Sequence, residues 1–234
     1  MSASDDLFVP PEQFSGTARL FPLPNLVLFP HVLQPLHIFE PRYREMLEEA
    51  MAGDRLIAMG LLMPGWEADY DGRPPVLPMA CLGRVASCQQ LADGRYNVLL
   101  AGLKRAAITK ELPAAKSFRE ARVRLKEDRY PMQGAAARPA LQRRLLEAFA
   151  QKLPRSAEMR EQFDHLLATQ ISLGTLTDIL AYSVDLTVGA KQRLLSELDV
   201  DRRAAMLVEH LEQTDRQPAA VEGAAIFPPG FSVN

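Results

Sequence analysis

The sequence has few of the features that mark membrane, secreted or metal-binding proteins. No stretch approaches the ~18 unbroken apolar residues of a membrane span, and the start, Met1 to Asp6, has neither the basic residues nor the apolar run of a signal peptide. The only two cysteines are Cys81 and Cys88. On one extended strand they would lie roughly 23 Å apart on opposite faces, and a structural zinc needs four ligands. We therefore expect a cytoplasmic protein with no disulfide, no metal and no cofactor.

An excess of charge is also absent, as are the motifs of ATP-driven and hydrolytic enzymes. The chain has 234 residues, of which 27 are basic and 29 acidic, and 47% are hydrophobic. This is an ordinary globular composition without the basic excess of most nucleic-acid-binding proteins. No glycine is followed directly by lysine, so the phosphate-binding loop G-x-x-x-x-G-K-[ST] is missing. The motifs G-x-S-x-G and H-E-x-x-H are missing too, and we expect no catalysis.

The first half of the chain reads as short strands interrupted by one helix. Apolar runs predict strands over residues 20–28, 33–39, 56–62, 80–88, 96–101 and 118–126. Pro22 and Pro24 restrict the first of these to an edge strand or a bulged extension. Asp93-Gly94 is a strong hairpin signal between the fourth and fifth strands. Several short strands around one helix favour a small barrel.

The helix is predicted to begin at Pro41 and to end at Gly53. Its apolar residues fall at i, i+3, i+4, i+7 and i+8, namely Tyr43, Met46, Leu47, Ala50 and Met51. Proline suits a first helical position and glycine a helix end. Glu40 and Arg42 border the start of this helix, and we interpret them as an orienting pair rather than as a catalytic acid and base.

The second half changes to a helical period. Apolar residues repeat at helical spacing within residues 141–149, 163–167, 176–180, 194–198 and 204–211. The change falls between Pro131 and Pro139. After Thr214 an Ala/Pro/Gly-rich tail carries Phe227 and Phe231, and we expect it to dock on a groove of its own body or of a partner. The predicted organisation is an extension (1–16), a barrel (17–130), a helical subdomain (131–213) and the tail (214–234), an α+β fold.

Several ordered blocks resemble the substrate-binding domain family of Lon proteases. The two longest are F-P-L-P-N-L-V-L-F-P at 21–30 and L-H-I-F-E-P-R-Y-R at 36–44. Shorter ones are C-L-G-R-V at 81–85, D-G-R-Y-N at 93–97 and K-Q-R-L-L at 191–195. The resemblance covers roughly residues 17–211. It implies a PUA-like antiparallel β-barrel with one inserted helix, followed by a C-terminal α-helical subdomain, in a stand-alone form without the ATPase and peptidase domains.

The resemblance implies a module that binds exposed apolar segments of unfolded or tagged polypeptides, as a recognition module or adaptor for a protease or chaperone. RNA binding stays open as an alternative because PUA-type barrels often bind RNA, although fold alone does not fix function. Arg122, Arg124, Lys126 and Arg129 form the one modest basic edge that supports it. An enzyme using a carboxylate or His37 is a third hypothesis, but a hydrogen-bonded structural histidine is favoured.

A candidate peptide-binding site centres on the only tryptophan. Trp66 lies with Met63 and Tyr70 in a loop rich in proline and glycine. We expect a large aromatic side chain on such a loop to be buried against the protein itself or against a ligand. One interpretation is that Trp66 folds back and caps the barrel. The other is that these three residues form an apolar rim with Phe39 and Tyr43, across which an extended peptide lies.

Overall fold

The computed structural model describes residues 5–8, 14–152 and 171–214. Six strands are present in these ranges: β1 (Thr17–Leu23), β2 (Leu33–Ile38), β3 (Leu56–Leu61), β4 (Met79–Gln90), β5 (Tyr96–Glu111) and β6 (Arg119–Lys126). The helices are α1 (Pro41–Ala52), α2 (Arg138–Ala150), α4 (Leu173–Ser183), α5 (Val188–Ser196) and α6 (Val200–Thr214), with short 3-10 turns η1 (Asp5–Phe8), η2 (Trp66–Asp69) and η3 (Met132–Gly134). The predicted helix at 163–167 and the tail aromatics lie outside the described residues.

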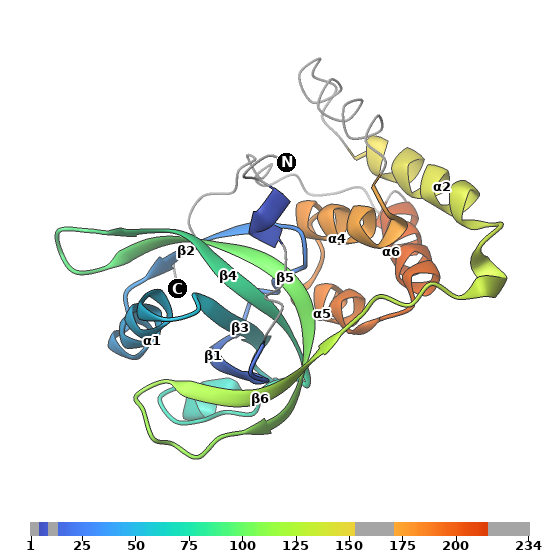
Figure 1. The fold of residues 1–234 in the computed structure, drawn as a ribbon. Helices are drawn as coiled ribbons and strands as arrows, with labels where there is room; N and C mark the ends of the chain where they lie inside the picture. Colours follow the sequence, from blue (N-terminus) through green and yellow to red (C-terminus); the bar gives the residue numbers. More distant parts are fainter. Residues whose placement is uncertain (1–4, 9–13, 153–170, 215–234) are drawn as a thin grey trace. The chain divides into compact units, whose positions relative to one another are not determined.

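The strands form one sheet that curls into a barrel (Figure 1). Their order is β2-β5-β4-β3-β1-β6, and an additional pairing of β5 with β6 closes the ring. The long strand β5 makes this possible, because it pairs with β4 along its length, with β2 near its start and with β6 near its end. Strand β2 is the last strand at one edge of the sheet. Pro35 lies on this strand, and an edge is where a sheet tolerates proline.

The α+β barrel fold predicted from the sequence is confirmed, with one difference. Among the six named strands, all pairings are antiparallel except that of β1 with β3, which is parallel from Arg19–Ile57 to Leu23–Leu61. Parallel neighbours need a crossover connection, and here the connection contains α1. The sheet is therefore mixed.

The barrel core follows the two-residue period of its strands. Its buried members are Ala18, Leu20, Leu56, Ala58, Leu82, Leu103, Ala106, Ala121 and Val123. On β6 the predicted alternation is present, since Ala121 and Val123 are buried while Arg122 and Arg124 are exposed. Gly102 permits a close approach of two segments, because a Cβ atom there would lie 1.9 Å from the carbonyl oxygen of Phe29.

The chain divides into two compact units, and helix α5 belongs to the barrel unit. That unit contains residues up to Glu127 and the segment Thr187–Ser196. In α5 the Gln192 side chain donates to the carbonyl of Met79 at 2.7 Å, and Arg105 donates to the carbonyl of Leu195 at 2.8 Å. The organisation expected from the sequence includes this segment in the helical subdomain (131–213). Its apolar period showed that one face is buried, but it could not show against which partner.

The second unit contains α2, α4 and α6 and is organised around a buried cation. Arg203 is fully buried on α6. It pairs with Asp178 at 3.3 Å and Asp128 at 2.6 Å, and donates to the carbonyl of Glu197 at 2.8 Å. Helix α4 begins at a capping residue, since the Ser172 hydroxyl accepts the backbone N–H of Thr175 at 3.1 Å. Within the described ranges no helix is long and apolar enough to cross a membrane.

Candidate functional site

The five residues proposed from the sequence as a peptide-binding rim differ in exposure. Phe39 and Met63 are exposed, with 38% and 40% of their surfaces accessible. Trp66 begins η2 and Tyr70 follows it, and both are half-buried. Tyr43 lies in the first turn of α1 and is buried, with its ring centre 4.5 Å from that of Phe21.

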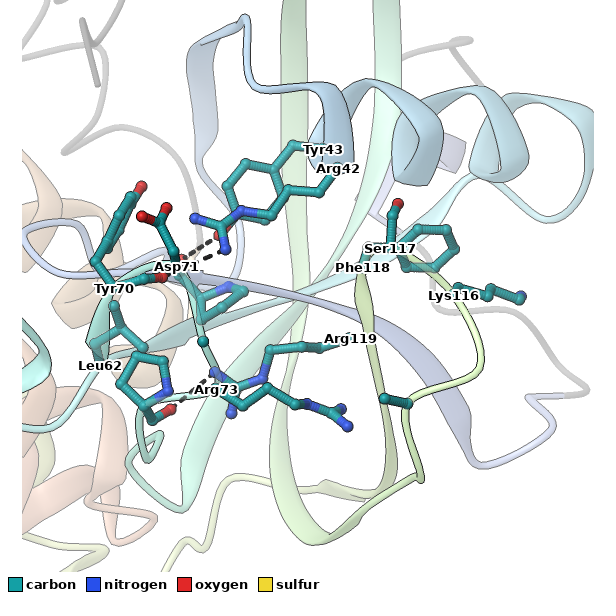
Figure 2. Close-up of a pocket in the computed structure, with 14 residues that line it drawn as sticks. Arg42, Tyr43, Leu62, Tyr70, Asp71, Arg73, Lys116, Ser117, Phe118 and Arg119 are labelled. Carbon is teal, nitrogen blue, oxygen red and sulfur yellow. Dashed lines mark hydrogen bonds between the residues drawn. The ribbon is translucent and has the colours of Figure 1, made fainter.

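Arg42 contacts two of these aromatic side chains, and a third extends the stack. Its guanidinium carbon lies 5.0 Å from the centre of the Tyr43 ring and 4.9 Å from the centre of the Tyr70 ring. Trp66 meets Tyr70 nearly edge-on, with centroids 5.5 Å apart and planes at 67°. Cation–π contacts of this kind contribute ~0.5–1 kcal/mol at exposed sites and more when desolvated. We call Tyr43, Arg42, Tyr70 and Trp66 the Arg42 stack; Figure 2 labels the first three.

Glu40 ties the stack together through both carboxylate oxygens. One oxygen accepts from Arg42 Nε at 3.0 Å and Nη2 at 2.8 Å, and the other accepts from the Tyr70 hydroxyl at 2.7 Å. Arg42 also donates to the Tyr70 carbonyl at 3.3 Å. The orienting pair predicted at Glu40 and Arg42 is therefore present. The Glu40 side chain makes no capping hydrogen bond to α1, because its carboxylate is engaged in the stack.

The stack carries a charged guanidinium and neutral phenols. Burial raises the pKa of Tyr43 above its ordinary value, and burial together with the Glu40 hydrogen bond raises that of Tyr70. Burial alone would lower the pKa of Arg42, but neighbouring Tyr43 and the Glu40 carboxylate outweigh it, so this pKa is raised. Both tyrosines thus remain hydrogen-bond donors near neutral pH.

A cleft of about 230 Å³ opens beside the stack (Figure 2). It is bounded by the start of α1, the segment after η2 and the loop that leads into β6. Its apolar and aromatic lining residues are Pro22, Tyr43, Leu62, Tyr70, Pro74, Ala114 and Phe118. A concave surface that combines apolar walls with a few fixed polar groups is typical of a binding site.

The charged side chains that line this cleft are mostly cationic. They are Arg42, Arg73, Lys116 and Arg119, with Asp71 as the one carboxylate. Arg119 is buried, and its guanidinium donates to Glu111 through Nε at 2.9 Å and to the Pro74 carbonyl through Nη1 at 2.8 Å. Arg73 donates to the Leu112 carbonyl at 3.2 Å and has only a long contact with Glu111, 3.6 Å.

Lys116 is held between two carboxylates outside the cleft lining. Its ammonium lies 2.6 Å from Glu49 and 3.1 Å from Glu120, and 5.1 Å from the centre of the Phe118 ring. The hydrogen bond that Lys116 donates to the Glu49 carboxylate raises the pKa of Lys116 despite partial desolvation. Burial would raise the pKa of Glu49, but the bond and charge of Lys116, with Arg19, lower it.

The structure brings together some of the predicted residues and leaves others apart. Tyr43 and Tyr70 line the cleft, and Trp66 contacts Tyr70. Phe39 instead lines a smaller hollow on the other side of Tyr43. Met63 lines neither hollow, and its N–H donates to Pro75. The sequence reasoning missed the cationic lining residues Arg73, Lys116 and Arg119.

The remaining expectations from the sequence concern His37 and metal binding. His37 is half-buried, and its Nδ1 lies 2.9 Å from the Asn97 side-chain oxygen, as favoured for a hydrogen-bonded histidine. In the part of the chain that the structure describes, no group of three or more His, Cys, Asp or Glu residues is arranged to hold a metal ion.

Comparison with known proteins gives one consistent family. Residues 17–213 match the model of the ATP-dependent protease La (LON) substrate-binding domain. The Lon protease of Heliobacterium modesticaldum is 30% identical over 193 residues, which is 82% of this chain and 23% of that protein. The Lon protease of Xanthomonas oryzae pv. oryzae is 27% identical over 191 residues, 81% of this chain and 22% of that protein. The chain thus spans about a quarter of the length of these relatives.

Solved structures agree on the fold. The N-terminal domain of Mycobacterium avium complex Lon protease superposes with a TM-score of 0.66 at 17% identity, covering 84% of this chain and 98% of that one. The Lon N-terminal domain protein from Xanthomonas campestris gives a TM-score of 0.57 at 19% identity, covering 82% and 97%. At these identities the likeness supports the fold alone.

Proposed function

The chain belongs to the family of Lon substrate-binding domains, and on that premise we propose that it binds exposed apolar segments of unfolded or tagged polypeptides in the cleft beside the Arg42 stack. The observation that carries this proposal is the cleft itself, where apolar walls adjoin half-buried Trp66 and Tyr70. Tryptophan and tyrosine are enriched among the residues that anchor protein interfaces.

The arrangement of the stack suits a binding surface more than a catalytic centre. Arg42 and Glu40 satisfy one another and the Tyr70 hydroxyl, so neither side chain is left as an activated base or nucleophile. Such a fixed surface can bind an extended chain with little loss of its own conformational freedom. We propose that the chain acts as a recognition module or adaptor that presents polypeptides to a protease or chaperone.

The single tryptophan of the chain provides a direct test. A permanently unfolded, tryptophan-free polypeptide is titrated into the protein, and binding is followed both by anisotropy of the labelled polypeptide and by Trp66 emission. We expect both signals to saturate together. Anisotropy without a change in Trp66 emission would place the binding surface away from the cleft, and absence of any binding would overturn the function.

The same titration separates the alternatives left open by the sequence. Single-stranded RNA of similar length is tested in parallel, and tighter binding of RNA than of polypeptide would overturn the proposal in favour of the RNA-binding alternative. The absence of a phosphate-binding loop predicts no nucleotide site. Stoichiometric heat on titration with ATP in a calorimeter would contradict a purely binding role.

A further inference from the structure

We propose that the cleft selects polypeptide segments in which a carboxylate stands next to an apolar side chain. This inference rests on the proposed function and names the class of segment that the same site takes. Four cationic side chains, Arg42, Arg73, Lys116 and Arg119, line the cleft against one carboxylate, Asp71. A concave surface lined by one sign of charge concentrates its field on the space inside.

The carboxylates that pair with these cations lie outside the cleft lining. Glu40, Glu49, Glu111 and Glu120 contact the cations, yet none of the four is among the lining residues. They hold the cationic groups in place from outside the lining. The cations therefore present pre-oriented donors to the cleft, and a pre-oriented donor loses less freedom when it binds a ligand.

Two of the four cations are exposed enough to reach a ligand carboxylate directly. The side chains of Arg73 and Lys116 are 36% and 33% exposed, compared with 21% for Arg42 and 10% for Arg119. Arg73 has the weakest internal ion pair, with 3.6 Å to Glu111. Arg119 and Arg42 are less exposed, and each is fixed by a carboxylate and a backbone carbonyl at shorter distances than the Arg73–Glu111 contact. Arg73 and Lys116 are thus the residues that a bound carboxylate would contact, since charge-assisted bonds are the strongest hydrogen bonds available to them.

The apolar walls supply the second half of the selectivity. Leu62, Phe118 and Pro22 line the same cleft as these cations, so a segment with adjacent acidic and apolar residues can satisfy both at once. The outer face of β6 lacks this combination. There Arg122 and Arg124 are exposed and have no ion pair within the described residues, but they line neither of the two hollows described above.

This difference provides a matched control. Arg73→Gln/Lys116→Gln removes two cations from the cleft, and Arg122→Gln/Arg124→Gln removes two from the outer face. Each variant is first checked for an unchanged melting temperature. The ligands are tryptophan-free peptides with an amidated C-terminus and adjacent Leu and Asp residues, the same peptides with Asn for Asp, and the Asn peptides with a free C-terminal carboxylate. The last set distinguishes a side-chain carboxylate from a chain terminus as the source of the charge.

For the parent protein we expect the Asp peptides to bind roughly tenfold more tightly than the Asn peptides, as one charged hydrogen bond allows. The cleft variant should lose this preference, whereas the outer-face variant should keep it. Equal binding of Asp and Asn peptides by the parent would overturn the selectivity and leave the proposed function standing. Loss of the preference in the outer-face variant would also overturn it. Failure of every peptide and of the unfolded polypeptide would instead overturn the proposed function.

Discussion

Replacing Trp66 by alanine tests whether the Arg42 stack is a binding surface. Trp66 contacts Tyr70 with centroids 5.5 Å apart, and it lies in a 3-10 turn that contains no buried residue. The barrel core does not include it. The substitution should therefore leave the fold intact while it removes one apolar wall next to the cleft.

The expected losses of stability and of binding affinity differ in size. An edge-to-face aromatic pair contributes about 0.5–1.5 kcal/mol, which is small beside the total stability of a domain, typically about 5–15 kcal/mol. Truncating an aromatic anchor of an interface costs about 2 kcal/mol or more in binding. Since every 1.4 kcal/mol is about tenfold in Kd, an unfolded polypeptide should bind the Trp66→Ala variant roughly 30-fold more weakly.

Anisotropy of a labelled unfolded polypeptide measures this effect, because the variant has no tryptophan left to report it. Met132→Ala is the matched control: Met132 is 85% exposed and belongs to the helical unit, so its truncation should change the Kd less than about twofold. If Trp66→Ala folds normally and binds as tightly as the parent does, Trp66 only covers the end of the barrel. The binding surface would then have to be sought on other residues.

Three further substitutions test the structural interpretation. Lys116 lowers the pKa of Glu49 below its ordinary 4.5 despite burial. The stability that this ion pair contributes is therefore present above pH 4.5 and is lost as the pH falls through the lowered pKa. Urea unfolding should show Glu49→Gln less stable than the parent at pH 7, and a difference in stability that does not change with pH would refute this. Ser172→Ala removes the cap of α4 and should lower the unfolding free energy by about 1 kcal/mol, whereas Ser172→Asp should not. Arg203→Ala removes the buried cation that pairs with Asp178 and Asp128 and should cost roughly 3–5 kcal/mol, because one side of a buried ion pair is lost. The melting temperature should recover in part when Asp178→Ala is added, and a normal melting temperature of the single variant would contradict this.

Local patterns in the sequence predicted the individual elements well. The apolar positions of α1 are an example, since Tyr43, Met46, Leu47 and Ala50 are all buried. A helix buries one stripe whatever lies against it, so its period can be read without knowledge of the partner. The Asp93-Gly94 turn was predictable for a similar reason, because Gly94 has a positive φ of 81° that glycine adopts without strain.

Partners distant in the sequence were not predictable from these patterns. The parallel pairing of β1 with β3 depends on the path of the crossover connection. The apolar period of a strand carries no information about that path. Helix α5 contacts the barrel through Gln192 and Arg105, and neither residue type indicates burial. Hydrophobic periodicity shows that a face is buried, but it does not show which surface covers that face.

One cleft residue did leave a signal in the sequence. The alternation that places Ala121 and Val123 inside the barrel also places Arg119, two residues earlier, on the inner face of β6. Arg119 is indeed 8% exposed. A charged residue at an inward position has to be paired, and Glu111 on β5 supplies the partner. Arg73 and Lys116 lie on loops, where no period applies, and only the fold brings them to the cleft.

The position of the cleft follows from where the barrel ladder stops. Strands β1 and β6 pair from Thr17–Arg122 to Leu20–Arg119, and no pair follows. Two residues after Leu20 comes Pro22, which has no N–H to donate and so cannot continue a ladder on both sides of β1. Pro22 and Arg119, at this end of the pairing, both line the cleft, and the Pro22 carbonyl accepts the Tyr43 hydroxyl at 3.4 Å instead. The edge position that Pro22 predicted for its strand is not observed, because β1 lies between β3 and β6. Pro22 instead lies past the last pair of β1 with β6, where the proposed binding site begins.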